Sequence, residues 1–375
     1  MRKGWEYKRF DEVFDLQMGK TPDRKNPEYF GGNNVWVSIR DLGDKEIADS
    51  NEHITNLAVC DTKIRKVKRG TVIMSFKLTV GKCGIAATDL YTNEAIMAFN
   101  PKESFDINSS FLYYYLQCYH WVGSNKAVMG ITLNKATISK QYISLPPKST
   151  QLAIVSELDK INELIRLKKE QLKDFDNLAQ SLFYEMFGDP VENEKGWEVK
   201  KIKDIAKYYN GVAHEQDVDK DGDFVLINAK FISSEGQIKK YSSIQRFPLL
   251  KNDIVMVLSD LPNGKSLAKC FLIDEDNKYT LNQRICCFRG FEGSSVYLKN
   301  IINRNPYLLS FDNGKGQTNL RKGDVEKLPI PLPPLPLQRL FAQRIEQIER
   351  EKSEVQKSIQ DLETLLASRM QYWFE

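Results

Sequence analysis

The chain has 375 residues, of which 41% are hydrophobic and 28% charged, and its formal net charge is +4. These proportions are ordinary for a soluble globular protein and exclude a disordered or membrane chain, while the length favours two domains over one. No apolar run approaches the roughly 20 residues that span a bilayer. Because Met1 is followed by Arg2 and Lys3 and not by an apolar secretion signal, a cytoplasmic protein that contacts no membrane is expected.

The cysteines and histidines indicate neither a metal site nor a catalytic centre. The six cysteines lack metal-ligand spacing, and the three histidines are isolated in the sequence, so reduced core thiols are expected and neither zinc nor a histidine general base. Aspartates alternate from 217 to 223, but a calcium loop that starts at Asp217 would need Glu at its twelfth position, where the chain has Asn228. No glycine-rich phosphate-binding motif occurs. No metal ligand and no catalytic residue are predicted.

Short local patterns predict the first strands and the first helix. Residues 36–39, 71–74 and 84–87 are partly β-branched runs bounded by Gly, Asp or Lys, which predicts strands. Residues 111–119 favour a helix, with Ser109 or Ser110 as its N-cap. A mixed α/β domain is therefore expected in this part of the chain.

A long amphipathic helix is predicted to follow this domain. From Ile154 onward, a 4-3-4-3 spacing selects positions that are apolar in all but one case, which is the heptad pattern of a coiled coil. About 36 residues of helix would be about 54 Å long, and an apolar seam of that length must be covered. Its pairing residues would be Ile154, Leu158, Ile161, Ile165, Leu172, Phe175 and Leu182.

The second half of the chain repeats the first. Residues 3–8 recur at 195–200, and residues 143–151 recur at 330–338. Between these motifs, residues 224–227 and 253–257 are predicted strands. A second seam follows the repeat, with Phe341, Ile345, Ile348, Val355, Ile359, Leu362 and Leu366 as its pairing residues.

A short helix from 306 to 311 is also predicted in the second copy. Asn305-Pro306-Tyr307 at its start resembles the base-binding motif of amino-methyltransferases but lacks that motif's second proline. The same place in the first copy, at an offset of 195, opens the helix that begins near Ser110. A helix start is therefore favoured over a catalytic motif.

The repeat predicts an α+β fold of two similar domains, each followed by a long helix. The predicted boundaries are 1–148 and 191–335 for the domains, 149–190 for the central helix and linker, and 336–375 for the C-terminal helix. The seams could pair between two chains, but pairing within one chain is favoured because each domain is followed by its own helix. An antiparallel pair would give a circular, pseudo-twofold organisation.

Loops that combine cations with amide or hydroxyl side chains are the candidate functional sites. The offset between the copies is 192 at Trp5 and Trp197 but 182 at Met74 and Met256, so the loops differ in length while the framework is shared. Such side chains suit contacts with base edges and phosphates, although ordinary polar turns are the alternative. The candidates are Lys77, Thr79, Lys82, Lys126, Thr132, Asn134 and Lys135 in the first copy, and Asn263, Lys265, Ser266, Lys315, Gln317, Thr318, Asn319 and Arg321 in the second.

Residues 63–69 form the densest cationic run, with five Lys or Arg in seven positions. Such a run suits several phosphate contacts if it faces a duplex. Equally, charges of this kind protect an exposed strand edge from aggregation. The sequence leaves both interpretations open.

In its order of motifs the chain resembles the specificity subunit of type I restriction-modification enzymes. The resemblance extends over nearly the whole chain. It is carried by Gly-Trp-Glu at 4–6 and 196–198, Gly-x-Thr at 130–132 and 316–318, Pro-Pro-x-x-x-Gln ending at Gln151 and Gln338, and Met-Phe-Gly-Asp-Pro at 186–190. Each motif is weak alone, and the specificity comes from their order and duplication together with the two seams.

The resemblance implies a protein without an active site of its own. Two target recognition domains would each recognise one half of a split site in double-stranded DNA, and the paired helices would set the spacing and dock two methyltransferase subunits. Restriction subunits would join that core. The cofactor S-adenosylmethionine would belong to the methyltransferase, and ATP and magnesium to the restriction subunit. A stand-alone coiled-coil DNA-binding protein, or the specificity part of a modification-only assembly, is the alternative.

Overall fold

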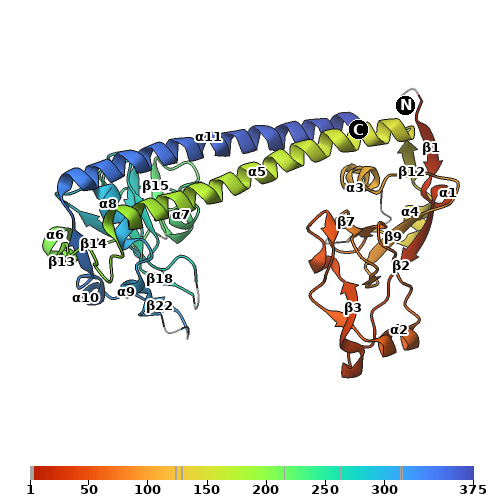
Figure 1. The fold of residues 1–375 in the computed structure, drawn as a ribbon, viewed down its shortest axis with the longest axis horizontal. Helices are drawn as coiled ribbons and strands as arrows, with labels where there is room; N and C mark the ends of the chain where they lie inside the picture. Colours follow the sequence, from red (N-terminus) through yellow and green to blue (C-terminus); the bar gives the residue numbers. More distant parts are fainter. Residues whose placement is uncertain are drawn as a thin grey trace. The chain divides into compact units, whose positions relative to one another are not determined.

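The computed structural model describes residues 4–122, 125–127, 130–214, 216–261, 264–312, 314 and 316–375, with the backbone alone for 125–127 and 130–132. It divides into two compact units, Met1–Lys169 with Lys357–Glu375, and Glu170–Gln356. Unit 1 and unit 2 each contain one α/β domain and one part of each of two long helices, α5 (Lys148–Phe187) and α11 (Leu335–Phe374) (Figure 1). The last residues of the chain therefore belong to the same unit as the first domain.

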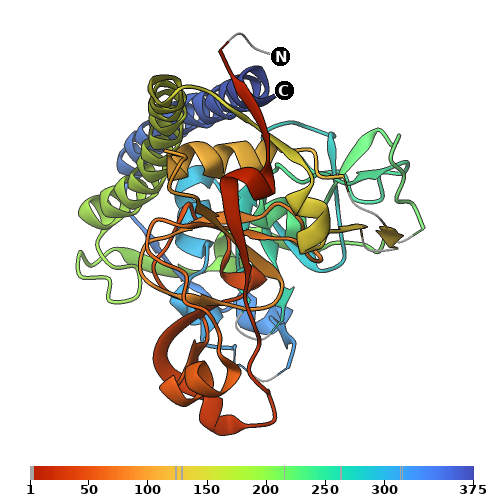
Figure 2. The same ribbon diagram turned by 90° about the vertical axis from the view of Figure 1, so that its right-hand side faces the viewer.

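A five-stranded sheet forms the centre of unit 1. Its strands lie in the order β2 (Phe14–Met18), β9 (Ile96–Pro101), β6 (Val72–Ser75), β7 (Cys83–Ala86) and β4 (Glu46–Ile47). Because side chains alternate between the faces of a strand, Val72 and Met74 pack towards helix α3 (Ser109–Cys118), whereas Ile73 packs on the opposite face. On that face lies the small sheet β5 (His53–Ile54), β3 (Phe30–Val37) and β8 (Tyr91–Thr92). Helix α3 lies between the sheet and the long helices of the unit (Figure 2).

Unit 2 repeats this arrangement. Its main sheet has the order β14 (Lys207–Asn210), β21 (Ile285–Arg289), β17 (Ile254–Val257) and β19 (Cys270–Leu272), with helix α8 (Ser295–Ile302) packed against it. Its second sheet has the order β16 (Tyr241–Ser242), β15 (Phe224–Ile227) and β20 (Tyr279–Leu281). In each unit the second sheet contains one parallel pair, β3 with β8 and β15 with β20.

The repeated motifs of the sequence are neighbouring strands in the fold. Strand β1 (Glu6–Arg9) pairs antiparallel with β12 (Tyr142–Leu145), and β13 (Glu198–Lys201) pairs in the same way with β23 (Pro329–Leu332). Each pair joins the start of a domain to the segment that leads into a long helix. The motifs at the two ends of each copy are therefore one structural feature.

Short elements complete the two units. In unit 1 these are α1 (Phe10–Val13), the 3-10 turns Pro27–Tyr29 and Ile39–Asp41, α2 (Asn56–Thr62), β10 (Asn125–Ala127), β11 (Gly130–Thr132) and α4 (Lys135–Ser139). In unit 2 they are α6 (Ile202–Ile205), α7 (Ala229–Ser233), β18 (Ser259–Asp260), α9 (Pro306–Leu309), β22 (Thr318–Asn319) and α10 (Lys322–Val325).

The helix predicted at 306–311 is a single turn, α9, and the true counterpart of α3 is α8. Asn108 caps α3 and Ser294 caps α8, so the offset of 195 assumed for these helices is wrong and the structural offset is 186. The β-branched residues of α8 favour a strand. Its buried positions, Tyr297, Leu298, Ile301 and Ile302, nevertheless follow helical spacing.

The predicted antiparallel pairing of the long helices is confirmed within each unit. In unit 1, Glu157 near the start of α5 accepts hydrogen bonds from Arg369 and Trp373 near the end of α11. In unit 2, Phe183 and Phe187 near the end of α5 contact Phe341 near the start of α11. Ile154, Leu158, Ile161, Ile165, Leu182, Phe341, Ile345, Ile348, Val355 and Ile359 are buried, and Leu172, Phe175, Leu362 and Leu366 are half-buried.

Polar residues interrupt the seam at specific places. Lys352 is 9% exposed and forms an ion pair with Asp176 at 2.8 Å between Nζ and Oδ1, and Arg369 pairs with Glu157. Both therefore contribute a contact between the helices in place of apolar packing. Among the described helices, none has a stretch that is long and apolar enough to cross a membrane.

Candidate nucleic-acid interface

In each unit, two loops that are distant in sequence meet beside the main sheet. In unit 1, the Leu133 N–H donates to the Phe76 carbonyl at 3.3 Å, which joins the loop after β6 to the segment before α4. In unit 2, the Leu320 N–H donates to the Leu258 carbonyl at 2.8 Å, which joins the loop after β17 to the segment before α10. Leu133 and Leu320 are both buried. The four candidate loops therefore form two composite sites, one in each unit, and in both sites a backbone hydrogen bond from a buried leucine joins the two loops.

The loop 76–82 of unit 1 is a tight turn held by Ser75. The Ser75 N–H donates to the Lys82 carbonyl at 2.8 Å, the Gly81 N–H donates to the Ser75 carbonyl at 3.0 Å, and the Ser75 hydroxyl donates to the Thr79 carbonyl. Thr79 and Lys82 are exposed, whereas Lys77 is half-buried. Leu78 has a φ of 61° and is 71% exposed. A fixed turn thus presents polar, cationic and apolar side chains to solvent.

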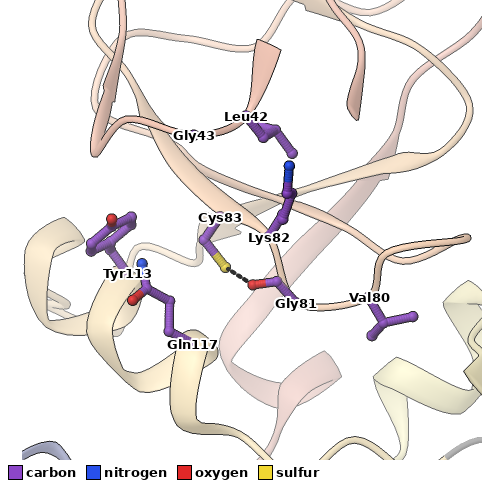
Figure 3. A pocket seen from close by; sticks show the side chains of 8 residues that line it. All are labelled: Leu42, Gly43, Val80, Gly81, Lys82, Cys83, Tyr113 and Gln117. Carbon is purple, nitrogen blue, oxygen red and sulfur yellow. Dashed lines mark hydrogen bonds between the residues drawn. The ribbon is translucent and has the colours of Figure 1, made fainter. Parts of the chain in front are cut away.

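This turn also borders a small hollow. The hollow has a volume of about 390 Å³, and Tyr113 and Gln117 of α3 line it opposite Val80 to Cys83 (Figure 3). Burial raises the pKa of the Cys83 thiol, which donates to the Gly81 carbonyl at 3.2 Å. A thiol kept protonated in this way is not a nucleophile. Cys83 is therefore a structural residue of the loop.

The second loop of unit 1 contributes Asn134 and Lys135. Both are exposed, and the Asn134 side-chain oxygen accepts the Thr137 N–H at 2.9 Å as the N-cap of α4. The amide NH₂ group of Asn134 is thereby turned away from this capping contact and can donate to another partner. Lys126 and Thr132 lie on the paired strands β10 and β11, and their side chains are outside the described part of the chain.

In unit 2 the two loops pair as strands. Ser259 lies opposite Asn319 and Asp260 opposite Thr318, and the Gln317 amide donates to the Ser259 hydroxyl at 2.9 Å. Gln317, Asn319 and Arg321 are exposed. These three side chains are accessible to a ligand.

Thr318 and Ser266 differ from the other candidates because they are held inside the loops. Thr318 is 7% exposed, and its hydroxyl donates to Asp312 at 2.8 Å. Hydrogen bonds from the Gly314 N–H and from Thr318 lower the pKa of Asp312. The half-buried Ser266 donates its backbone N–H to Asp260 at 2.7 Å. Lys265 is exposed, and Asn263 and Lys315 lie outside the described residues.

The segments before α4 and α10 correspond residue by residue at an offset of 187, whereas the loops after β6 and β17 begin at an offset of 182. Asn134 caps α4 and Arg321 occupies the N-cap position of α10, each directly after the leucine that joins the loops. Thr132 therefore corresponds to Asn319 and not to Thr318, so the shared Gly-x-Thr motif is one residue out of structural register. The frame is the same in both units, whereas the exposed side chains differ.

Sequence reasoning did not identify the residues that hold these loops. Asp260 accepts the N–H groups of Leu261 and Ser266 at 2.8 and 2.7 Å, and its carboxylate occupies the space beside Gly264, where a Cβ would lie only 2.1 Å away. The closeness of Asp260 and Gly264 in sequence was the available signal. A loop built around the half-buried acceptor Asp260 keeps its exposed side chains in place.

The repeated glutamines connect each domain to its long helix. Gln151 accepts the Asn108 N–H at 2.9 Å and donates to the Pro146 carbonyl at 3.0 Å. Gln338 accepts the Ser294 N–H at 3.0 Å and donates to the Pro333 carbonyl at 2.8 Å. Both glutamines are buried. The Pro-Pro-x-x-x-Gln motif therefore fixes the first turn of a long helix to the start of α3 or α8.

Replacing Gln338 with leucine is expected to lower the free energy of unfolding by about 1–3 kcal/mol, because the half-buried Ser294 N–H and the buried Pro333 carbonyl lose their partner. Chemical denaturation would measure the effect. The matched control is Gln343→Leu, at an exposed position of the same helix, with an expected change within about 0.5 kcal/mol. Equal losses in the two variants would contradict this role of Gln338.

The chain matches a family of known proteins over most of its length. Residues 2–174 and 194–364 match the model of the type I restriction modification DNA specificity domain. The chain belongs to this family. The predicted resemblance is thereby confirmed, and each of the two matched segments of this specificity-domain protein includes one α/β domain and part of a long helix.

Two curated relatives are themselves specificity subunits. The chain is 29% identical over 231 residues to the MjaIX specificity subunit of Methanocaldococcus jannaschii, a match covering 56% of this chain and 53% of the relative. It is 21% identical over 212 residues to the HindI specificity subunit of Haemophilus influenzae, covering 56% of this chain and 42% of that protein. The matches thus span about half the length of these relatives.

Solved structures share the fold over nearly the whole chain. A chain from the work on complex assembly and conformational transition of the type I restriction-modification system has a TM-score of 0.65 at 15% identity, covering 100% of this chain and 98% of that one. The type I specificity subunit from M. genitalium has a TM-score of 0.52 at 13% identity, covering 98% and 95%. The predicted fold class, two α/β domains with two long paired helices, is confirmed.

Proposed function

We propose that this specificity-domain protein recognises a bipartite site in double-stranded DNA, with each unit contacting one half. The observation that carries the proposal is the composite loop site, which occurs twice on one frame with different exposed side chains. Asn134 and Lys135 occupy positions where unit 2 has Arg321 and Lys322. In the major groove arginine typically pairs with guanine and asparagine with adenine, so Asn134 and Arg321 suit different bases. Because the same fold occurs twice with different exposed side chains, the two units would bind two different half-sites.

The long helices would dock two methyltransferase subunits and set the spacing between the halves. Two identical partners need a surface that is present twice, and one exposed apolar residue recurs at the helix offset of 187. Leu178 on α5 is 51% exposed and Leu365 on α11 is 45% exposed, and each directly precedes a seam position. Their recurrence supports a duplicated docking surface.

In this proposal the chain is a recognition subunit and the chemistry belongs to its partners. S-adenosylmethionine would bind the methyltransferase subunits, and ATP and magnesium the restriction subunits that join the core. In the described part of the chain, no group of three or more His, Cys, Asp or Glu is placed to hold a metal ion. The exposed polar side chains of the composite sites suit binding to DNA.

Co-expression with the methyltransferase partner, followed by mapping of methylated adenines, tests the proposal. The expected result is one split motif with a spacer of fixed length and unspecified sequence. Failure to form a complex, together with methylation that follows no split motif, would overturn the proposal and favour a stand-alone DNA-binding protein.

Alanine at Arg321 is expected to relax recognition in only one half of the site. Arg321 is exposed at the start of α10, and loss of a base-contacting arginine typically costs about 1–3 kcal/mol at the base concerned. Methylation of duplexes randomised in either half would measure the effect. The reciprocal variant, Lys135→Ala in unit 1, should affect only the other half. Equal relaxation of both halves by either variant would contradict the loop assignment.

A further inference from the structure

A dense row of cations lies on the surface of unit 1, from residue 63 to residue 69. The row consists of Lys63, Arg65, Lys66, Lys68 and Arg69, and all five side chains are exposed. The two intervening residues, Ile64 and Val67, are 5% and 0% exposed. The chain therefore buries its apolar residues here and directs every cation to solvent. We call residues 63–69 the cationic segment.

The backbone of the cationic segment is fixed by contacts with the rest of the unit. The buried Gln17 amide donates to the carbonyls of Arg65 and Lys66 at 2.9 and 3.2 Å. Val67 and Leu90 exchange two backbone hydrogen bonds, at 2.8 and 3.0 Å. Because the segment is already ordered, little backbone entropy would be lost when its side chains bind a ligand.

Lys66 is the one cation of the segment that forms an ion pair with a carboxylate in the described part of the chain. Lys66 forms a 3.6 Å ion pair with Asp89, which also accepts the Arg69 N–H at 3.0 Å. Within the described ranges, the side chains of Lys63, Arg65, Lys68 and Arg69 have no ion pair with a carboxylate. An anionic ligand with several charges would therefore meet four exposed cations that are not held in ion pairs.

The segment lies on the face of the sheet that is turned away from α3 and the long helices. Val67 packs with Ile73 and Ala98, on the side opposite the α3 cluster. The Lys20 side chain donates to the Thr62 carbonyl at 3.0 Å, just before the segment. Gly19, which precedes Lys20, donates its N–H to the Ile96 carbonyl, and the carbonyl of the neighbouring Ala95 accepts the Phe76 N–H. These hydrogen bonds connect Thr62, beside the cationic segment, through the end of β2 and the start of β9 to Phe76 of the composite loop site.

Unit 2 has the same backbone feature without the charge. The Leu249 N–H donates to the Tyr279 carbonyl as Val67 does to Leu90, so residues 245–251 are the counterpart of 63–69, at the offset of 182 that also relates β6 to β17. This counterpart contains only Arg246 and Lys251 as cations. Arg246 is engaged by the buried carboxylate of Asp217 at 2.9 Å. If these cations served only to protect a strand edge from aggregation, both units would be expected to have them. Only the segment of unit 1 is rich in cations.

We propose that the cationic segment of unit 1 binds backbone phosphates of the duplex beside the half-site that unit 1 recognises. This inference rests on the proposed function and adds a sequence-independent contact that unit 2 lacks. Phosphate contacts position a protein on DNA and raise its affinity without selecting bases. Because such contacts release counterions, the contribution of the cationic segment to affinity should decrease as salt is raised.

The test uses the complex with the methyltransferase and a triple variant, Lys63→Gln, Arg65→Gln and Lys68→Gln. Affinity for a duplex that carries the methylated split site is measured by fluorescence anisotropy over a range of salt concentrations. The slope of log affinity against log salt is expected to decrease in magnitude by about 0.9 for each phosphate that the variant no longer neutralises, or about 2–3 in total. The base preference in both halves should not change.

The matched control removes three exposed lysines of unit 2, with Lys220→Gln, Lys239→Gln and Lys240→Gln, and should keep the wild-type slope. An unchanged slope in the unit 1 variant, with a wild-type thermal unfolding curve, would overturn the inference. A changed base preference would also overturn it, because the cations would then contact bases. If the wild-type complex methylates no split site, the proposed function itself fails, whatever the slopes.

Discussion

Alanine in place of Phe341 is expected to lower the free energy of unfolding by about 3–5 kcal/mol, the usual range for removing a fully buried phenylalanine. The Phe341 ring is 0% exposed. Its centroid lies 5.2 Å from that of Phe187 and 5.6 Å from that of Phe183, both on α5. Truncation would leave a cavity at the place where the two long helices and α8 meet through Tyr297, whose ring centroid is 4.7 Å from that of Phe187.

The neighbouring residue supplies the control for this variant. Leu340 is 41% exposed, so Leu340→Ala should change the free energy of unfolding by no more than about 0.5 kcal/mol. Chemical denaturation of both variants measures the difference. A loss of similar size at Leu340, or none at Phe341, would show that this aromatic cluster does not hold the helix pair to the domain.

The long helices could be predicted from the sequence because their signal is local and repeated. In a heptad spacing, apolar residues recur three or four positions apart over several turns, so a short stretch of sequence is enough to detect the pattern. The polar interruptions could not be interpreted in the same way. Lys352 and Arg369 break the apolar pattern, and only the structure shows that each faces a carboxylate on the other helix, Asp176 and Glu157.

The composite loop sites could be predicted only in part. The loops were recognisable by their composition, but nothing local indicates that Leu133 bonds to Phe76 or Leu320 to Leu258. For the same reason, the sequence could not distinguish Thr318, which is bonded to Asp312, from the exposed Gln317 beside it. The bonds that join the loops connect residues more than fifty positions apart in the chain. Whether Thr318 is buried or exposed depends on how its own loop folds.

The missed helix α8 shows how an alignment by motif can fail. Asn305-Pro306 has a strong helix-start signal, and it does open a helix, but only the single turn α9. The position equivalent to α3 is instead defined by Gln338, which bonds to the cap residue of α8 as Gln151 bonds to that of α3. A buried side chain repeated in both copies was a better guide than the helix-start motif.

Insertion of four residues into each long helix is expected to change the length of the spacer that the complex tolerates. The insertions would follow Lys169 and Gln356, at the boundary between the two units. At about 1.5 Å per residue, four residues add about 6 Å of helix, which is close to two base-pair steps of about 3.4 Å. Methylation should therefore move to split sites whose spacer is about two base pairs longer.

These insertion points keep the existing pairing contacts on both sides. The ion pair between Lys169 and Glu363, at 2.9 Å, remains within unit 1, and the ion pair between Asp176 and Lys352, at 2.8 Å, remains within unit 2. Because both helices are lengthened equally, each seam keeps its own register. Neither the domains nor their composite loop sites are altered by the change.

Methylation of the original site should fall by about a hundredfold or more, because a half-site out of reach loses several base contacts worth about 1–3 kcal/mol each. Duplexes with a series of spacer lengths, methylated by the purified complex, would measure the shift. The control carries the insertion in α5 alone, which displaces one seam against the other. It should lower stability without creating a new preferred spacer. Undiminished methylation at the original spacer by the doubly lengthened protein would show that the helices do not set the spacing.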